Sequence, residues 1–273
     1  MEIVGYLASL LIGVSLGLIG GGGSILTVPV LVYLFHVNPV LASAYSLFIV
    51  GASSLVGAIP KYNQGLINVK TAIIFGIPSI AAVYATRKFI IQNIPSDVFI
   101  WGEFVITKSF LMMVLFAILM VAASISMISG KCEQCEKEKS EDYVAQQQVF
   151  NYPLILIEGT VVGILTGLVG AGGGFLIIPA LVMLSKLSMK QAIGTSLLII
   201  AAKSLIGFTG DLGVQIIDWN LLLTVTGLAI VGIFVGDILS KKIDGDKLKV
   251  GFGWFLLVMG IYILIQQIAF PFR

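Results

Sequence analysis

A glycine-rich stretch, Gly17-Leu18-Ile19-Gly20-Gly21-Gly22-Gly23-Ser24-Ile25-Leu26-Thr27-Val28-Pro29, occurs twice in this chain. Its second copy, Gly167-Leu168-Val169-Gly170-Ala171-Gly172-Gly173-Gly174-Phe175-Leu176-Ile177-Ile178-Pro179, begins 150 positions later. Each copy is a run of glycines inside apolar sequence and is closed by a proline. Glycine and proline are the residues that weaken a helix most. The pattern therefore predicts, in each half of the chain, a helix that stops and restarts.

The composition points to a membrane protein. Of the 273 residues, 58% are hydrophobic and only 11% are charged, whereas soluble domains carry about 25% charged residues. Apolar stretches close to the length of a bilayer recur from end to end, and long alternating segments typical of a membrane β-barrel do not. We therefore predict an all-α polytopic protein of the cytoplasmic membrane. Its first apolar run lacks the features of a cleaved signal peptide and is expected to remain as a span.

An internal repeat organises the chain. When residues 13–57 are compared without gaps with residues 163–207, 19 of 45 positions are identical, including glycines, a proline and two serines. Shared hydrophobicity alone does not align these residue types in one frame. We predict two homologous membrane repeats, at residues 1–129 and 153–273, joined by a polar linker at 130–152. Such internal symmetry is a common plan for secondary transporters.

The number of spans depends on the two segments that follow the glycines. Residues 24–36 and 175–186 are too short for a hydrocarbon core of about 30 Å. If they cross the membrane, each repeat has five crossings and the second repeat is inverted. If they re-enter, the repeats are parallel, so we expect eight to ten membrane helices. The positive-inside rule favours the inverted arrangement. The full spans are predicted at residues 3–19, 41–59, 69–85, 104–127, 153–169, 189–208, 221–240 and 250–270, with residues 86–102 as a polar connection.

The glycine breaks are candidate anion-binding sites. Helices that restart at Ser24 and Phe175 would present free N–H groups and the positive end of the helix dipole. Broken membrane helices are tolerated where the freed groups face protein or a water-filled cavity. The alternative is close helix packing through small residues. The candidate substrate-binding residues at the breaks are Gly20, Gly21, Gly22, Gly23, Ser24, Gly170, Gly172, Gly173 and Gly174.

The span that follows each break adds polar candidates. Hydroxyls in membrane helices often bond to their own backbone, but two serine pairs recur in both repeats, Ser46 with Ser196 and Ser54 with Ser204. Thr195 lies beside them. Lys203 lies inside an apolar span, where a charge costs at least about 2.5–3.5 kcal/mol on insertion scales. Either a bound anion or cavity offsets this cost, or Lys203 snorkels toward Gly210 or pairs with Asp211.

The remaining polar motifs are weaker. Cys132 and Cys135 form a single C-x-x-C motif in the linker, which lacks the four ligands of a zinc site. It is a thiol pair in a solvated linker, a redox dithiol or half of an intersubunit metal site. Asp237 and Lys241 have the i,i+4 spacing of a surface ion pair. We expect no metal, no cofactor and no enzyme activity, and the scattered charges argue against a nucleic-acid partner.

Several motifs together resemble the TauE/SafE-type sulfite and organosulfonate exporters. They are the two glycine stretches with their prolines, Ala192-Ile193-Gly194-Thr195-Ser196-Leu197-Leu198, and Ile217-Asp218-Trp219. The resemblance covers nearly the whole chain and implies a transporter of small sulfur-containing anions such as sulfite or sulfonates. Two features depart from it. Lys203 stands where such proteins more often look uncharged and polar, and the linker with Cys132 and Cys135 looks like an addition.

Two functions follow as hypotheses. The first is a secondary transporter of a small sulfur-containing anion, driven by a proton or ion gradient, since no nucleotide-binding P-loop occurs in the chain. The second is a membrane thiol-redox or sulfur-relay protein that uses Cys132 and Cys135. Replacing both cysteines separates them, because transport survives under the first hypothesis and activity disappears under the second.

Overall fold

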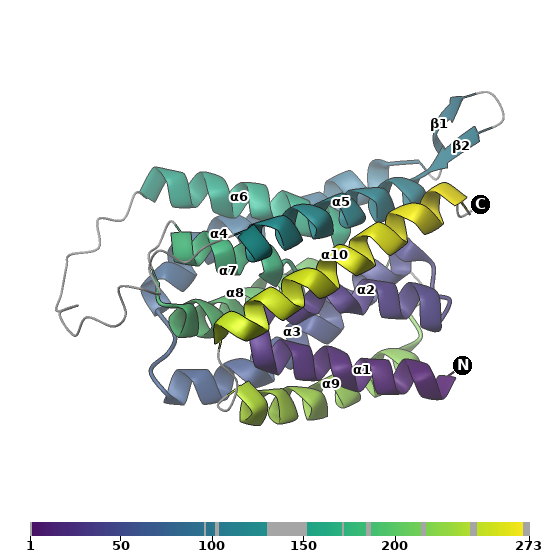
Figure 1. Ribbon diagram of the computed structural model, residues 1–273. Helices are drawn as coiled ribbons and strands as arrows, with labels where there is room; N and C mark the ends of the chain where they lie inside the picture. Colours follow the sequence, from purple (N-terminus) through teal and green to yellow (C-terminus); the bar gives the residue numbers. More distant parts are fainter. Residues whose placement is uncertain are drawn as a thin grey trace.

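The protein is a bundle of helices that run roughly along one direction (Figure 1). The structure is a computed structural model, and it describes residues 2–95, 97–101, 104–129, 152–170, 172–183, 187–213, 217–240 and 245–269. The motif Cys132–Cys135 and Lys241 lie outside the described residues. The principal helices are α1 (Glu2–Ile19), α3 (Pro39–Asn63), α4 (Val69–Ala85), α5 (Lys108–Ser129), α6 (Tyr152–Val169), α7 (Gly174–Met183), α8 (Met189–Thr209), α9 (Trp219–Ser240) and α10 (Gly245–Ala269).

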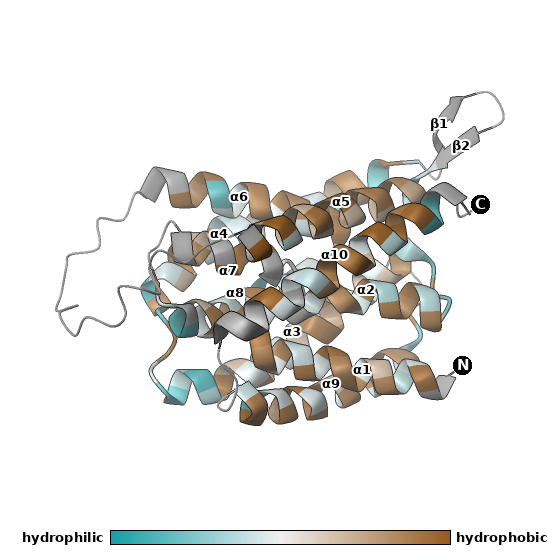
Figure 2. Cartoon of the chain, in the orientation of Figure 1, coloured by the Kyte–Doolittle hydropathy of each residue, from teal (hydrophilic) through white to brown (hydrophobic). Residues whose placement is uncertain are grey.

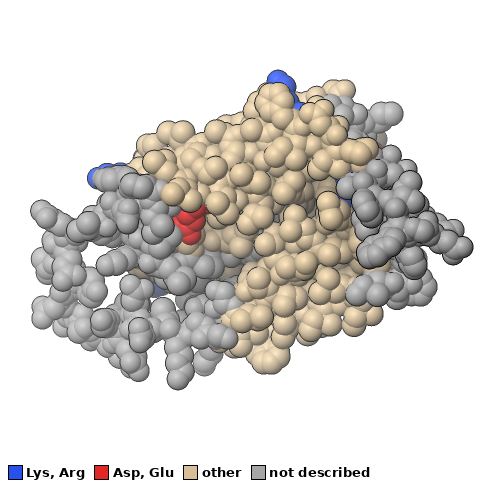
Figure 3. Space-filling model, turned by 90° about the horizontal axis from the view of Figure 1, so that it is seen from above, with Lys and Arg blue, Asp and Glu red and all other residues tan. Residues whose placement is uncertain are grey.

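The outer surface of the bundle is apolar. Brown, hydrophobic residues predominate along the helices in Figure 2, and few charged atoms appear among the described residues on the face seen in Figure 3. Leu7, Ile77 and Val258 are examples of large side chains that are each at least 60% exposed. Such a surface suits lipid, because a soluble protein rarely exposes contiguous apolar patches of this extent.

Five of the described helices are long and apolar enough to cross a membrane. They lie at Pro39–Asn63, Val69–Ile91, Lys108–Ile125, Lys190–Thr209 and Trp219–Ser240. Four shorter apolar helices are found at Val4–Ile19, Ser24–Leu34, Ile155–Val169 and Gly253–Gln267. These helices confirm the polytopic helical class, while the count of eight to ten spans stays a prediction.

The helical bundle also carries a small β-hairpin, which was not predicted. Strand β1 (Asp97–Trp101) pairs antiparallel with β2 (Phe104–Thr107), with Ile100 opposite Val105. The hairpin projects from one end of the bundle (Figure 1). Its residues are rich in β-branched and aromatic types, and Gly102-Glu103 separates the strands, which is a typical hairpin pattern. The span predicted from Phe104 therefore begins only at Lys108, and the predicted polar connection starts with a helical continuation of α4, the π-helical segment η3 (Thr86–Ile91).

Helices far apart in the sequence pack in pairs. Helix α1 lies against α9, α4 against α6, α3 against α8, and α5 against α10. Close approach depends on glycines at two of these contacts. A Cβ atom placed on Gly13 would lie 2.0 Å from the Ala229 carbonyl oxygen, and one placed on Gly163 would lie 2.6 Å from the Ser79 carbonyl oxygen. In Figure 1, α1 and α6 run in opposite directions across the bundle, as do α5 and α10.

Candidate functional site

The first glycine break is a change of helix type rather than a gap. Helix α1 ends at Ile19 and is followed by a 3₁₀ segment η1 (Gly20–Leu26), one α-turn α2 (Thr27–Pro29) and a π-helical turn η2 (Val30–Leu34). Gly22 and Gly23 lie within η1. The predicted restart at Ser24 therefore lies inside continuous helical backbone, and the α-helical pattern returns at Thr27. The four consecutive glycines allow the chain to tighten into a 3₁₀ helix, which keeps the backbone groups bonded locally.

The second glycine break interrupts the helix fully. Helix α6 ends at Val169, and α7 begins at Gly174, one residue before the predicted restart at Phe175. Gly170, Gly172 and Gly173 have φ angles of +76°, +65° and +69°. A backbone with positive φ is strongly disfavoured for other residues. This break therefore depends on glycine for its conformation, and α7 supplies a true helix N-terminus.

The two breaks contact each other in the buried interior of the bundle. A Cβ atom placed on Gly174 would lie 2.1 Å from the backbone of Gly21, so only glycine allows these two segments to meet. Beside them, Gly172 packs against Val50 and Ser24. A Cβ atom placed on Gly172 would lie 3.4 Å from the Cβ atom of Ser24. Gly21, Ser24, Gly172 and Gly174 are all buried. The structure thus brings predicted site residues from both halves into contact.

Lys203 on α8 points at the second break. Its side chain is buried, with 1% exposed, and its Nζ donates a hydrogen bond to Thr166 Oγ1 at 3.2 Å. A Cβ atom placed on Gly173 would lie 2.8 Å from this Nζ. The expected alternatives for Lys203 are wrong, because it does not snorkel to the surface and because Asp211 pairs with Arg87. Among the described residues, no carboxylate forms an ion pair with Lys203.

The predicted hydroxyls divide into two groups. Ser24 and Ser196 bond to carbonyls of their own segments, Gly21 and Ile193, and Thr195 Oγ1 accepts a hydrogen bond from the backbone N–H of Asn68 at 3.0 Å. These three are structural contacts. In contrast, the buried hydroxyls of Ser46, Ser54 and Ser204 have no hydrogen-bond partner within the described part of the chain.

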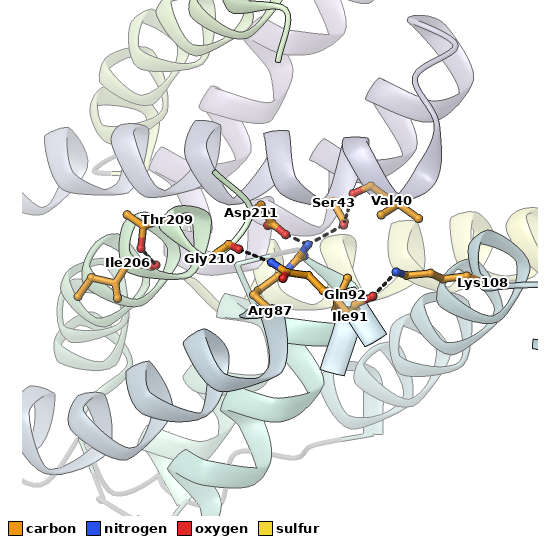
Figure 4. A network of polar contacts seen from close by, with 10 residues as sticks. All are labelled: Val40, Ser43, Arg87, Ile91, Gln92, Lys108, Ile206, Thr209, Gly210 and Asp211. Carbon is orange, nitrogen blue, oxygen red and sulfur yellow. Dashed lines mark hydrogen bonds and ion pairs between the residues drawn. The ribbon is translucent and has the colours of Figure 1, made fainter. Parts of the chain in front are cut away.

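A buried network around Arg87 was not predicted (Figure 4). Arg87, on η3, is fully buried, and its Nη1 lies 3.2 Å from Asp211 Oδ2 and donates to Ser43 Oγ at 3.0 Å. Its Nε and Nη2 have no partner among the described atoms. A Cβ atom placed on Gly170 would lie 2.3 Å from Nη2, so the guanidinium also packs on the second break.

Two further side chains complete this network in Figure 4. Gln92 donates to the Gly210 carbonyl at 2.8 Å, and Lys108 donates to the Ile91 carbonyl. Asp211 follows the apolar span that ends at Thr209. Burial raises the pKa of its carboxyl above the ordinary value, although the charges of Arg87 and Lys108 lower it. The ion pair is therefore held in surroundings that disfavour an ionised carboxylate.

A second ion pair joins the halves elsewhere. The Nζ atom of Lys61, near the end of α3, lies 2.7 Å from Asp237 Oδ1 on α9. Asp237 therefore pairs across the bundle, and its predicted partner Lys241 lies outside the described residues. The sequence held one signal for both pairs. Lys61 and Asp211 are 150 positions apart, as are Arg87 and Asp237, which is the offset of the glycine stretches.

Comparison with known proteins identifies the family. A family model described as "Sulfite exporter TauE/SafE" matches residues 6–263. The chain belongs to the TauE/SafE sulfite exporter family. It is 29% identical over 262 residues to a "probable membrane transporter protein" of Xylella fastidiosa (strain 9a5c), with 95% of this chain and 93% of the relative covered. No solved structure matches the chain closely enough to count as similar.

Two further relatives of this TauE/SafE member come from other organisms. The "probable membrane transporter protein YdhB" of Bacillus subtilis (strain 168) is 28% identical over 233 residues, which cover 84% of this chain and 86% of the relative. A "probable membrane transporter protein" of Methanocaldococcus jannaschii is 35% identical over 116 residues, or 40% of this chain and 43% of the relative. The predicted family and class are confirmed: the chain is a multi-pass membrane transporter, not an enzyme.

Proposed function

We propose that this protein is a secondary transporter of a small sulfur-containing anion, which binds where the two glycine breaks meet. The observation that carries the proposal is Lys203, a buried cation that points at the second break and has no counterion among the described residues. Burying an ion without a partner is expensive. A transported anion would supply the missing charge during each cycle.

The surroundings of Lys203 suit an oxyanion. The N-terminus of α7 and the glycine backbone before it favour negative charge, and Thr166 Oγ1 already accepts from Lys203 Nζ. Further donors are the unpartnered hydroxyls of Ser46 and Ser54 on α3 and of Ser204 on α8, the helix that carries Lys203. The family description supports sulfite or a related anion as the substrate. The coupling ion, a proton or another cation, is part of the proposal.

An inverted repeat would place both breaks at one central site. The proposed repeats are residues 1–129 and 153–273, joined by the linker 130–152. Two hydrogen bonds between the repeats support this arrangement. The offset of 150 residues converts one bonded pair into the other, because Asn68 corresponds to Asp218 and Tyr45 to Thr195. The N–H of Asn68 donates to Thr195 Oγ1, and the N–H of Asp218 donates to Tyr45 Oη at 2.6 Å. The opposite directions of α1 and α6 in Figure 1 agree with inversion.

Transport in proteoliposomes tests the proposal. Uptake and efflux of labelled sulfite, thiosulfate, sulfate and an alkyl sulfonate are measured for the wild type, Lys203→Gln and Lys203→Arg. We expect one sulfur anion to move under a proton or sodium gradient, Lys203→Gln to abolish this movement, and Lys203→Arg to retain part of it. Lys190→Gln is the matched control, because Lys190 is an exposed lysine on the same helix, α8.

The outcomes separate the competing functions. If the wild type moves none of these anions, the sulfur-anion assignment is wrong. If Lys203→Gln transports as well as Lys190→Gln, the site at the second break is wrong. The double variant Cys132→Ser/Cys135→Ser should transport normally, and its loss of activity would favour the thiol-redox alternative instead.

A further inference from the structure

Two ion pairs connect the first half of the chain to the second. Arg87–Asp211 joins η3 to the residue that follows α8 by two positions, and Lys61–Asp237 joins α3 to α9. In both pairs the base comes from residues 1–129 and the acid from residues 153–273.

The two pairs are equivalent, with their charges exchanged. Adding 150 to Lys61 gives Asp211, and adding 150 to Arg87 gives Asp237. Under the proposed repeat, each pair therefore occupies the position of the other, with the base and the acid swapped. A surface pair retained by chance would have no reason to recur at this offset.

The pairs lie at opposite ends of the bundle. Segment η3 leads directly into the hairpin at one end, whereas the last turns of α9 lead into the start of α10 at the other end (Figure 1). Each pair also adjoins one break. Arg87 packs on Gly170, and a Cβ atom placed on Gly17, just before the first break, would lie 2.8 Å from the Asp237 nitrogen.

Both pairs are closed and shielded from solvent. The exposed fractions of the side chains are 0% and 7% for Arg87 and Asp211, and 11% and 16% for Lys61 and Asp237. A buried ion pair adds little net stability compared with apolar packing, because the desolvation of both charges offsets their attraction. The raised pKa of Asp211 expresses the same cost. We therefore expect these ion pairs to fix the relative orientation of the two halves more than to stabilise the fold.

We propose that Arg87–Asp211 and Lys61–Asp237 are the two closures of the anion pathway, one for each side of the membrane, and that they open alternately. The inference rests on the proposed transport function. Each pair links the two halves at one end, so separating one pair opens the central site to that side while the other pair holds the opposite side closed.

Thiol labelling without substrate tests the alternation. In a variant with both native cysteines replaced by serine, Ser43→Cys reports on the Arg87 end and Ile193→Cys on the Lys61 end. These positions are 150 residues apart and pack on Gly170 and Gly20, respectively. Labelling by a membrane-impermeant maleimide is measured in vesicles of both orientations. We expect Lys61→Gln to increase labelling of Ile193→Cys and decrease that of Ser43→Cys, and Arg87→Gln to do the reverse.

Controls separate opening from unfolding. Charge exchange in Lys61→Asp/Asp237→Lys should return labelling to the parent level, and Lys190→Gln should leave it unchanged. Every variant must elute as a single peak in size-exclusion chromatography. If Arg87→Gln fails this criterion, the labelling of the Lys61→Gln variant alone tests the proposal. Changes in the same direction at both reporters, or no change, would overturn the proposal. Reciprocal labelling in a protein that moves no sulfur anion would retain the closures and reject only the proposed substrate.

Discussion

The two glycine breaks have similar sequences but different structures. The first continues as 3₁₀, α and π turns, and among its described glycines only Gly20 has a positive φ. The second has three glycines with positive φ and ends at a true helix start. The side chains around them differ as well. Lys203 lies at the second break, whereas its counterpart by the 150-residue offset, Ser53, bonds to the Ile49 carbonyl of its own helix at 2.5 Å. A repeated backbone motif therefore does not imply repeated chemistry.

The largest expected effect is at Lys203. In Lys203→Met, transport should fall below detection, while the thermal stability of the purified protein should rise. Replacing a buried ion pair by apolar side chains of similar volume often stabilises a protein by about 1–4 kcal/mol, and a buried charge without a partner is also costly. Thr166 would keep its own hydrogen bond to the Gly163 carbonyl. Transport and a thermal melt in detergent check the two parts together.

Ser53→Ala is the matched change on the other helix. Ser53 is fully buried, like Lys203, but its hydroxyl serves only its own backbone. We expect transport and melting temperature to stay close to the wild type. If Ser53→Ala abolished transport as Lys203→Met does, both breaks would take part equally in binding the anion, and the proposed difference between them would be wrong.

A smaller effect is expected at the glycines of the second break. Gly173→Ala places a methyl group 1.9 Å from Thr166 Cγ2 and 2.8 Å from Lys203 Nζ, at a φ of +69°. The substitution therefore combines backbone strain with a steric clash beside the lysine. We expect it to lower the transport rate and the stability of the protein together. The rate in proteoliposomes and a denaturant titration measure these effects.

Gly213→Ala isolates the strain alone. Gly213 has a φ of +85°, and a Cβ atom there meets nothing within 4 Å. We expect it to cost about 1–2 kcal/mol, the usual penalty for a left-handed backbone, with no change in the transport rate of the folded fraction. Equal loss of transport in Gly173→Ala and Gly213→Ala would show that strain, and not the position beside Lys203, causes the loss.

Much of the fold could be predicted from the sequence. The low fraction of charged residues and the recurring apolar stretches identified a polytopic helical membrane protein, and the glycine pattern located both breaks. The hairpin at residues 97–107 was missed because its short run of apolar residues continues into α5, and length alone does not separate a strand from a helix there. The 3₁₀ continuation through the first break was not predicted, because a run of glycines permits both a tightened helix and an open turn.

The charged residues of the site were harder to predict. Lys203 was found because a lysine inside an apolar span is rare and costly. Arg87 was missed because it lies near the end of a span, where basic residues are ordinary. The contact between Lys61 and Asp237 was missed, since i,i+4 spacing on one helix is visible in a sequence and a contact across the bundle is not. Only the shared offset of 150 residues could have revealed the two ion pairs.

The smallest predicted effect concerns the hydrogen bonds that recur at the two ends of the bundle. The N–H of Asp218 donates to Tyr45 Oη, and the N–H of Asn68 donates to Thr195 Oγ1. Tyr45→Phe and Thr195→Val each remove one acceptor and keep the shape of the side chain. A hydrogen bond of this kind contributes about 1 kcal/mol net, so we expect similar, modest losses in the free energy of unfolding, measured by reversible denaturation in mixed micelles.

The double variant Tyr45→Phe/Thr195→Val extends this comparison. Sites that share no partners give additive changes within about 0.5 kcal/mol. We therefore expect the double variant to lose the sum of the two single effects and to transport at the wild-type rate, because neither bond involves the breaks. A loss well above the sum would mean that the two ends are energetically coupled. In that case the loops that start α4 and α9 would belong to the same conformational unit as the central site, and the difference between the breaks would have to be sought in motion as well as in chemistry.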